Sequence, residues 1–372
     1  MPKLDDVPQE GGSKSHADRP NFSVVYDWLV VGAGPAGIAA VGKLLDNGVP
    51  PNRVCWVDPE FRAGDLGAKW LNVSSNTKVR IFKLFFRACR SFEYQKDGFA
   101  LETFGDEETC LLSNVAKPLQ SITAQLMLKV ATLRTTVTGI RMKGGIWHAT
   151  SALGDVGSRN VVLAIGAEPS RMRYQAPCIS LDDALDPDRL RQALEKDGVV
   201  GVFGSSHSAI MAIHNLIDAG ASRVINFYRS PLRYAVDYGD WILYDNTGLK
   251  GVTADWARGQ MGKLPDERLL RVKSDRKTVE RYLPLCTKVV YGVGFKARDI
   301  PVDGVDLTKY DRKLGTIGPG LFGCGIAFPE RVVDREGNVE YNVGMWKFMQ
   351  YLDRVVPMWI ELSSRRRKSR RG

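Results

Sequence analysis

The chain has 372 residues, of which 44% are hydrophobic and 25% are charged. This composition is ordinary for a soluble protein with two domains and excludes a fibrous or wholly disordered chain. The formal net charge is +10, but six basic residues lie in the last eight positions, and without them the net charge is +4. We therefore expect residues 363–372 to form a solvated, disordered basic tail, and we expect no specific nucleic-acid binding.

The six cysteines are scattered and form no CxxC pair. Their spacing excludes a zinc ribbon and indicates a reducing compartment, so we expect a cytoplasmic protein. Residues 1–22 are polar and rich in Gly, Ser, Pro and Asp, which is typical of a disordered arm rather than a secretory signal. The longest stretch without Asp, Glu, Lys or Arg, residues 198–217, is interrupted by Gly204 and His207, so we expect no membrane span.

The first element is an apolar strand that runs into a glycine-rich turn and then a helix, in the sequence DWLVVGAGPAG from Asp27 to Gly37. Its GxGxxG glycines suit a tight turn, close approach to a pyrophosphate and close packing of helix on strand. The N-terminus of the helix favours a phosphate. The expected dinucleotide contacts are Gly32, Ala33, Gly34, Pro35, Ala36 and Gly37.

A second strand, Arg53–Val57, ends on Asp58, which is followed by Pro59. An acid at this position accepts hydrogen bonds from a ribose and opposes a 2′-phosphate. We therefore expect Asp58 and Pro59 to lie beside an adenosine without that phosphate. The alternative is that Asp58 only forms the turn before Pro59.

The segment Gly64–Phe86 begins with glycines and then becomes apolar. Because it follows the adenosine half, we expect it to lie along the isoalloxazine ring of a flavin, with Lys69, Trp70, Asn76 and Thr77 nearest the ring. Trp70 and Asn76 are the catalytic candidates. The alternative for residues 75–77 is an N-cap for the segment that follows.

From Leu133 onward apolar residues alternate, which predicts an antiparallel meander that includes Val137. The apolar strand Asn160–Ser170 ends at Gly166 and Ala167, where the backbone must again approach something closely. Val137, Gly166 and Ala167 are therefore expected cofactor contacts, and residues 169–187 are expected to cross between domains.

A second dinucleotide unit begins at Gly198 with the strand Val199–Phe203 and a GxSxxA version of the fingerprint. A helix is predicted from His207 to Ala219. The expected contacts are Gly204, Ser205, Ser206, His207, Ser208 and Ala209.

The next strand, residues 223–228, ends on Arg229 and Ser230. Arg229, with Arg233 nearby, can pair with a 2′-phosphate, which favours NADPH over NADH. The alternative is a surface arginine without a ligand.

Residues 231–261 are aromatic and irregular, so they either line a substrate pocket or pack internally. Residues 287–295 and 319–326 are again apolar strands that run into glycine, and Gly294 is an expected cofactor contact. The last helix, residues 343–362, is amphipathic and is expected to pack on the core.

The segments in which an apolar strand runs into a glycine-containing turn resemble those of the flavoproteins with two dinucleotide-binding domains. These flavoproteins form the glutathione-reductase-like superfamily, which includes flavin-containing monooxygenases. The resemblance covers about residues 24–362, and its motifs are GAGPAG with Asp58, VVLAIGAEPS, GSSHSA, YGVGF and LFGCGI. It implies an α/β fold of two Rossmann-like domains, with the NAD(P) domain inserted in the FAD domain. The implied FAD-binding parts are residues 23–190 and 297–362, and the implied NAD(P)H-binding part is residues 191–296.

By this resemblance, Gly325 and Ile326 contact the pyrophosphate and ribityl chain of FAD, and Val343 and Gly344 face the pyrimidine edge of the flavin. The sequence departs from the superfamily at Ile326, where an Asp is usual. GAKWLNVSSNTK is similar to segments beside the flavin in class B monooxygenases, but their FxGxxxH stretch is replaced by MRYQAPCISLDDAL. The absence of CxxC argues against the disulfide-reductase branch.

The implied function is an FAD-dependent oxidoreductase in which NADPH transfers a hydride to FAD and the flavin is then reoxidised, with monooxygenase chemistry on a small organic substrate. One alternative is an oxidase or reductase that passes electrons to a quinone or another small acceptor. A second is a redox-sensing flavoprotein without turnover. The partner is expected to be a small molecule, and an oligomer is possible.

The Arg229→Ala variant is expected to bind NADPH at least about tenfold more weakly, because a charge-assisted bond to the 2′-phosphate is lost. NADH, which lacks that phosphate, should bind almost as before. Dissociation constants for both nucleotides test this, and equal losses for the two would falsify the 2′-phosphate role.

Overall fold

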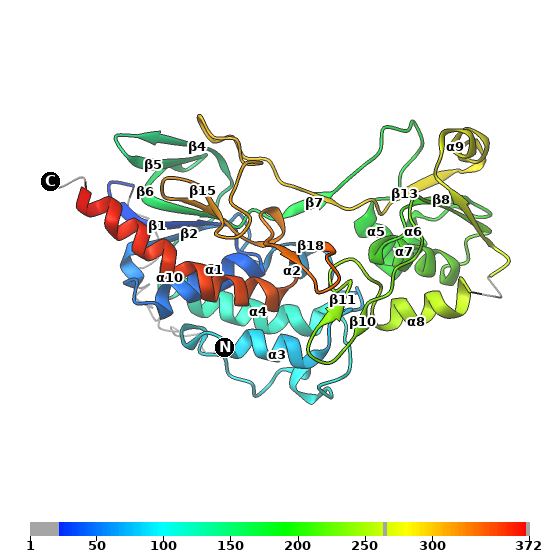
Figure 1. Ribbon diagram of the computed structural model, residues 1–372, viewed down its shortest axis with the longest axis horizontal. Coiled ribbons are helices and arrows are strands. Elements are labelled where there is room, and N and C mark those ends of the chain that lie inside the picture. The colour runs from blue at the N-terminus through cyan, green and yellow to red at the C-terminus, as the bar shows by residue number, and fades with distance from the viewer. Residues whose placement is uncertain (1–21, 263–265, 370–372) are drawn as a thin grey trace, which may run out of the picture.

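The computed structural model describes residues 22–262 and 266–369 (Figure 1). The arm expected at residues 1–22 therefore lies outside the described residues apart from Phe22, as do the last three residues of the expected tail. Among the described residues, no helix combines the length and the apolar character needed to cross a membrane.

The first half of the fold is built on an eight-stranded sheet, with the path β15-β16-β6-β1-β2-β3. Its central strand is β1 (Val25–Val31), which pairs in parallel with β2 (Val54–Val57) and β6 (Gly154–Leu163). In this register Val31 lies opposite both Val57 and Leu163, so the three strands end at one edge of the sheet. The outer strands of the path are β3 (Ala131–Leu133), β16 (Leu321–Gly323) and β15 (Thr316–Gly318).

The expected meander is confirmed. Strands β4 (Val137–Lys143) and β5 (Ile146–Ser151) pair antiparallel, and β5 pairs with the first half of β6. The second half of β6 pairs with β16 instead. The ten residues of β6 therefore join the meander to the parallel strands.

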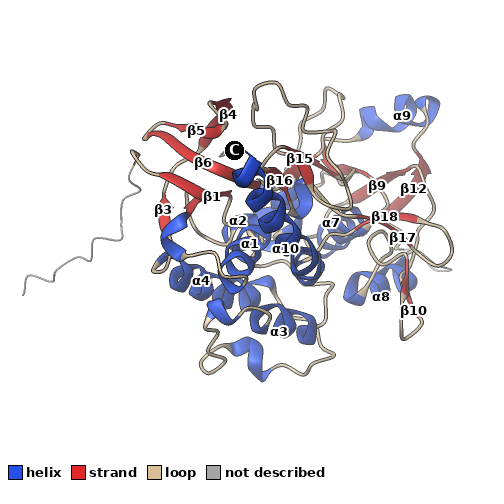
Figure 2. Cartoon of the chain, turned by 60° about the vertical axis from the view of Figure 1, so that its left-hand side comes forward, coloured by secondary structure: helices blue, strands red, loops and turns tan. Residues whose placement is uncertain are grey.

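Alternation along β1 assigns its residues to two cores, as expected for a strand covered on both faces. Trp28 and Val30 pack in a cluster with the helices, whereas Leu29 and Val31 pack with Trp147 of the meander. The helices of this half lie together on one face of the sheet (Figures 1 and 2). They are α1 (Pro35–Asp46), α2 (Gly64–Ala68), α3 (Val79–Arg87), α4 (Leu112–Met127) and α10 (Met345–Ser369).

The expectation of a disordered tail is wrong for residues 363–369, because α10 continues to Ser369 through Pro357. Two of the basic residues there, Arg365 and Arg366, have partners on the folded protein. Arg365 forms an ion pair with Glu361 one turn earlier, and Arg366 Nη2 donates to the carbonyl of Gly145 at 3.1 Å. These contacts favour continued helix where composition alone suggested disorder.

The second half is a four-stranded parallel sheet in the order β12-β9-β8-β13. Its strands are β8 (Val199–Phe203), β9 (Arg223–Tyr228), β12 (Leu269–Lys273) and β13 (Lys288–Tyr291). The bounds of β8 and β9 agree with the sequence prediction, and the expected helix after β8 is α7 (His207–Asp218).

The segment described from sequence as irregular, residues 231–261, contains the hairpin β10 (Val236–Asp237) and β11 (Ile242–Leu243) and the helix α8 (Gly251–Gln260). The irregular assignment is thus wrong for α8, which packs on α7 in the core of this half. The other helices here are α5 (Leu181–Leu185), α6 (Pro187–Ala193) and α9 (Arg276–Tyr282).

The chain passes between the halves twice, and the two passages pair with each other. Strand β7 (Ala167–Pro169) is antiparallel to β14 (Phe295–Ala297) in a separate two-stranded ladder. A last hairpin, β17 (Arg331–Val333) and β18 (Val339–Tyr341), precedes α10. The predicted domain limits, between residues 190 and 191 and between 296 and 297, stay predictions.

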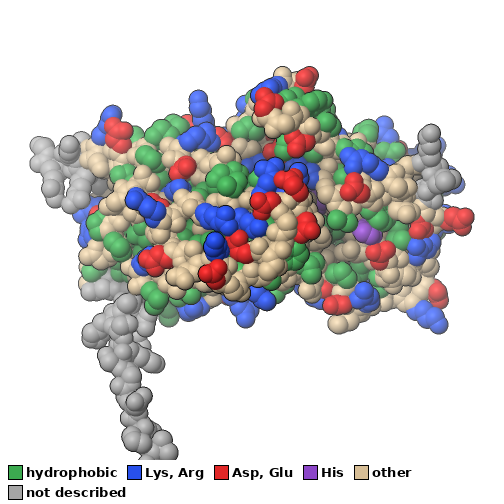
Figure 3. Space-filling view, turned by 90° about the horizontal axis from the view of Figure 1, so that it is seen from below, with side chains coloured by type: hydrophobic (Ala, Val, Ile, Leu, Met, Phe, Trp, Pro, Cys, Tyr) green, Lys and Arg blue, Asp and Glu red, His purple; other side chains and the backbone are tan. Residues whose placement is uncertain are grey.

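Charges on the face shown in Figure 3 are mixed, with basic and acidic side chains side by side over the same elements. No broad basic field covers this face.

Truncation of Trp359 to alanine tests α10 as a core helix. Its indole is 1% exposed, stacks on Phe322 with ring centroids 4.7 Å apart, and donates to the Leu314 carbonyl at 2.7 Å. We expect Trp359→Ala to lower the free energy of unfolding by about 3–5 kcal/mol, measured by urea denaturation. Met358→Ala, at a neighbouring exposed position, should change it by less than about 1 kcal/mol. Similar losses in the two variants would contradict this packing.

Candidate cofactor site

The three glycines after β1, Gly32, Gly34 and Gly37, differ in what a side chain at each position would meet. A Cβ at Gly37 would lie 1.9 Å from the Gly32 carbonyl oxygen, and one at Gly32, where φ is +107°, would lie 2.3 Å from the Ala164 oxygen. Both are therefore required by the packing of helix, turn and strand. Gly34 is not, because φ is −74° and the nearest atom to its Cβ would be 3.9 Å away. Its missing side chain leaves space above the turn.

That space faces the N-terminus of α1. Gly34 is the N-cap and offers no side chain to the first amide groups of the helix, and the first turn holds no acid. A helix end of this kind suits an anion such as a pyrophosphate. The turn thus fits the phosphates of a dinucleotide, and the expected contacts Ala33, Pro35 and Ala36 lie on it.

Asp58 holds this turn in place. Its Oδ2 accepts a hydrogen bond from the Ala33 amide at 2.7 Å, and its Oδ1 accepts from the amides of Glu60 and Phe61 at 2.8 and 2.7 Å. These are the bonds of a turn-forming residue, the alternative noted from sequence. Oδ2 accepts one hydrogen bond from the described residues and keeps capacity for a second, so the ribose role of Asp58 and its neighbour Pro59 stays a prediction.

Two further glycines that follow strands lie at the same edge of the sheet. A Cβ at Gly325, just after β16, would lie 2.6 Å from the Cβ of Ala36 in α1. At the end of β6, a Cβ at Gly166 would lie 2.9 Å from Arg298 Nη1. Expected contacts Ala167 and Ile326 are the next residues along each segment. The structure thus brings GAGPAG and LFGCGI together, as the resemblance implied, and adds Arg298, which the sequence analysis missed.

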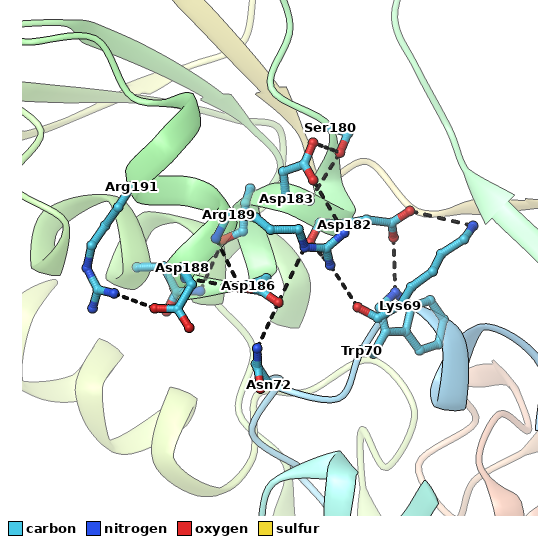
Figure 4. A network of polar contacts seen from close by, with 12 residues as sticks. Lys69, Trp70, Asn72, Ser180, Asp182, Asp183, Asp186, Asp188, Arg189 and Arg191 are labelled. Atoms are coloured by element: carbon cyan, nitrogen blue, oxygen red, sulfur yellow. Dashed lines mark hydrogen bonds and ion pairs between the residues drawn. The ribbon is translucent and has the colours of Figure 1, made fainter. Parts of the chain in front are cut away.

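The segment expected beside the flavin ring is fastened to α5 and α6 (Figure 4). Trp70 Nε1 donates to Asp182 Oδ1 at 3.0 Å, and Lys69 Nζ lies 3.6 Å from Asp182 Oδ2. Arg189 Nη2 donates to the Lys69 carbonyl at 2.8 Å. Trp70 and Lys69 therefore use their polar groups to join the two halves.

Asn72 adds a second link, since its Nδ2 donates to Asp186 Oδ2 at 3.1 Å. Burial opposes ionisation of Asp186, but hydrogen bonds from the Arg189 amide, Asn72 and the Asp188 amide outweigh it and lower its pKa. The acid-rich sequence LDDALDPDR was the only signal for these partners, and nothing local indicated which segment they would meet.

Asn76 and Thr77 lie beyond this network. Asn76 is exposed and accepts a bond from Thr77 Oγ1 at 3.2 Å. Ser75 Oγ accepts from the Thr77 amide at 2.9 Å, but α3 begins at Val79 with Lys78 as its N-cap. The alternative placed an N-cap near residues 75–77, and the structure places it at the next residue, Lys78, which makes no side-chain cap bond.

The second glycine turn opens on a cavity of about 490 Å³. Six residues predicted to bind the nicotinamide cofactor line it, namely Gly204, Ser205, Ser206, Arg229, Ser230 and Gly294. The walls also include Arg233, and Met172, Thr247 and Ser274, which the sequence analysis missed. Ser274 directly follows β12, a strand that had not been predicted.

The cavity fits a phosphorylated dinucleotide. The N-terminus of α7 has no side-chain cap, and Arg229 and Arg233 are both exposed at the rim. A Cβ at Gly204 would lie 2.2 Å from the Gly292 oxygen, so the turn is as tight as the first one. Ala209 is fully buried and serves the packing, since a Cβ at Gly292 would lie 2.7 Å from its Cα.

His207 begins α7, ahead of Ser208, and neither residue lines the cavity. Its Nδ1 is sealed from solvent and has no hydrogen-bond partner among the described residues. Burial and the nearby charge of Lys250 lower the pKa of His207 to about 4. The ring is neutral at neutral pH and brings no positive charge to a phosphate.

The aromatic segment divides between the two roles considered for it. Trp256 stacks on His214 at 4.7 Å and Tyr234 packs against the second core, so these two are internal packing residues. Pro231, Arg233 and Thr247 reach the cavity.

Val343 and Gly344 precede α10, and Val137 begins β4 in the meander. Gly344 has φ of +136°, and a Cβ there would meet nothing within 4 Å, so this helix end is open. The Val343 amide donates to Asn246 Oδ1 at 3.2 Å.

No group of His, Cys, Asp and Glu among the described residues could hold a metal ion.

A scan against protein-family models matched none. The monooxygenase AgnR1 of Paecilomyces divaricatus is 34% identical over 385 residues, covering 89% of this chain and 97% of that protein. The chain belongs to the family of this monooxygenase. The membership confirms the predicted superfamily and the prediction of an oxidoreductase with monooxygenase character.

Solved structures show the same fold at low identity. A flavin-containing monooxygenase from Stenotrophomonas maltophilia is 14% identical with a TM-score of 0.58, covering 91% of this chain and 97% of that chain. The Kutzneria ornithine N-hydroxylase, described with reduced FAD and NADP+, is 14% identical with a TM-score of 0.58, covering 91% and 99%. The bacillithiol disulfide reductase of Staphylococcus aureus is 12% identical with a TM-score of 0.59, covering 90% and 98%.

These likenesses confirm the predicted α/β class with two Rossmann-like units. The expected pair of FAD and NADPH agrees with the ligands named for the ornithine hydroxylase. The roles of the individual site residues stay predictions.

The two glycines Gly34 and Gly37 form a matched test of the FAD site. Gly34→Ala should fold as stably as the natural protein, because the added methyl would lie at an ordinary contact distance of 3.9 Å from its nearest atom, Gly64 Cα, yet it should lose bound flavin because the methyl fills the expected pyrophosphate space. Gly37→Ala should be destabilised, because its methyl overlaps the Gly32 oxygen. Thermal unfolding and visible flavin absorbance of the purified proteins test both, and full flavin content in Gly34→Ala would rule out this site.

Proposed function

We propose that the chain is an FAD-dependent monooxygenase that uses NADPH as its reductant and acts on a small organic substrate. The observation that carries the proposal is the 34% identity with a monooxygenase over nearly the whole of both chains. When bound, FAD would accept a hydride from NADPH and deliver electrons to O2, chemistry that belongs to the cofactor. The chain supplies binding, orientation and exclusion of water.

The first glycine turn supports an FAD site. Gly34 leaves space above the N-terminus of α1, and Gly325 meets Ala36 at the same edge. Asp58, bonded to the Ala33 amide, keeps a carboxylate near the expected ribose, where it would oppose a 2′-phosphate. Ile326 offers no carboxylate at the ribityl end, so backbone groups would have to bind there.

The second turn supports an NADPH site. Its cavity combines an uncapped helix N-terminus, which suits the pyrophosphate, with Arg229 and Arg233, which suit the 2′-phosphate. The opposite charges at the ends of β2 and β9 would direct FAD and NADPH to different halves. Gly294 at the end of β13 leaves open space for the rest of the cofactor, since a Cβ there would meet nothing within 4 Å.

Electron transfer to a dithiol has no support in this chain. All six cysteines are free and the sequence has no CxxC pair. Four of them, Cys55, Cys89, Cys110 and Cys324, are buried, and burial raises the pKa of each thiol.

The proposal also includes a cytoplasmic location, which rests on the absence of disulfides among these cysteines.

Anaerobic mixing with NADPH tests the first half of the proposed reaction. We expect the visible absorbance of the bound flavin to bleach within seconds in a stopped-flow instrument, and more slowly with NADH at the same concentration. A flavin that keeps its absorbance would leave a redox-sensing protein as the better description. Rapid O2 consumption with stoichiometric peroxide and no substrate would instead indicate an oxidase.

A further inference from the structure

Asn246 lies where the two halves meet, on the loop between β11 and α8. Its Oδ1 accepts hydrogen bonds from the Val343 amide at 3.2 Å and from Lys347 Nζ at 2.6 Å. Its Nδ2 donates to Asn342 Oδ1 at 3.3 Å and to Glu340 Oε2 at 3.2 Å. An amide side chain has two acceptor and two donor positions. All four are occupied, by Glu340 of β18, by Asn342 and Val343 of the segment that follows it, and by Lys347 of α10.

Glu340 is the anchor of this contact. Glu340 is only 3% exposed, and burying a carboxylate costs free energy unless it is hydrogen-bonded. Oε2 accepts from both the amide and the Nδ2 of Asn246, and Oε1 accepts from Thr247 Oγ1 at 2.6 Å. Among the described residues, the hydrogen bonds to the Glu340 side chain all come from these two residues of the other half.

The charges around the contact are balanced. Asp245 pairs with Lys347 at 2.6 Å and also with Lys250. Burial lowers the pKa of Lys347, with the attraction of Asp245 opposing it. Lys250, Lys347, Asp245 and Glu340 carry two charges of each sign, so the contact depends on fitted hydrogen bonds and less on net attraction.

The contact has a cofactor region on each side. Thr247 lines the cavity proposed for NADPH. Val343 and Lys347 belong to the open N-terminal end of α10, which is expected to face the flavin. Asn246 and Glu340 therefore connect the wall of one cofactor site to the end of the other.

We propose that Asn246 is a positioning residue, which with Glu340 sets the distance and angle between the nicotinamide cofactor and the flavin. The inference rests on the proposed function. Asn246 touches no reacting atom; it holds Thr247 and α10 in the relative arrangement in which the hydride passes. Small displacements between reacting groups cost rate steeply, and about 1 Å is enough for a hundredfold loss.

Three variants separate this role from a structural one. Asn246→Ala removes all four bonds. Glu340→Gln keeps the shape of the side chain but replaces one acceptor oxygen with a donor, so a donor of Asn246 or Thr247 is left unpaired. Glu336→Gln is the matched control, because it makes the same change at an exposed position in the turn of the same hairpin.

We expect the limiting rate of flavin bleaching at saturating NADPH to fall at least about tenfold in Asn246→Ala and Glu340→Gln. Flavin content and melting temperature of Glu340→Gln should match those of the control. Calorimetry adds a readout that needs no turnover. Binding of NADP+ should weaken about tenfold in both variants, whereas binding of adenosine 2′,5′-bisphosphate, which reaches only the Arg229 end, should be unchanged.

The positioning role would be overturned if both variants bleached the flavin with the limiting rate of the natural protein. It would also be overturned if the affinities for NADP+ and for the bisphosphate fell by the same factor. If the natural protein is not bleached by NADPH at all, the proposed function fails, and calorimetry alone then decides the inference. A loss confined to NADP+ would support it, and unchanged NADP+ affinity in both variants would overturn it.

Discussion

The pairing of β7 with β14 is the constraint on which the rest of the structure depends. Among the described residues, the mixed eight-stranded sheet and the parallel four-stranded sheet share no strand, and the chain passes between them through these two segments, which are hydrogen-bonded to each other. Such a narrow ladder places the second half but does not by itself fix its orientation. Arg298, next to the ladder, pairs with Asp65 and donates to Ile165, which ties the passage to α2 and to the end of β6.

Two polar clusters complete the orientation. One joins Trp70 and Asn72 to the acids of α5 and α6, and the other joins Asn246 to Glu340 and the start of α10. Hydrogen-bonded groups accept only a narrow range of geometry, so they specify an orientation better than an apolar contact of the same size. Their loss is also less costly than the loss of a core, which suits a joint between halves that must bind and release a cofactor.

The glycine turns could be predicted from sequence because strand, glycine turn and helix follow one another within a few residues, although the atoms that crowd Gly32 and Gly204 belong to the distant residues Ala164 and Gly292. Gly32 and Gly37 belong to the same tight turn, in which a Cβ at Gly37 would overlap the Gly32 oxygen. The bounds of β8 and β9 were predicted to the residue from the strand and helix periodicity around GSSHSA. The partners of Trp70 and Asn246 could not be predicted in this way. They lie 112 and about 100 residues away along the chain, and no local pattern records which acid meets which donor.

The failures have the same cause. Composition predicted disorder for residues 363–369, but Arg366 finds the Gly145 carbonyl, which is 221 residues earlier in sequence. Helix α8 was missed because the aromatic residues of the segment 231–261 suggested a pocket lining, whereas Trp256, the one aromatic residue of α8, stacks on His214 of α7. In both places tertiary contacts decided a structure that local preference left open.

Helix α10 carries a mechanical consequence of its length. Its 25 residues make a rod of about 37 Å, with Lys347 at the joint between the halves and Arg366 on the distant meander. Near its middle Pro357 has no amide hydrogen to give to the Asp353 carbonyl, so the rod has a compliant point there. Asp353 is itself bound to Lys43 of α1 at 2.6 Å. A disturbance of the meander would therefore be absorbed by the anchored middle of the rod, and the end beside Asn246 is insulated from the far edge of the molecule.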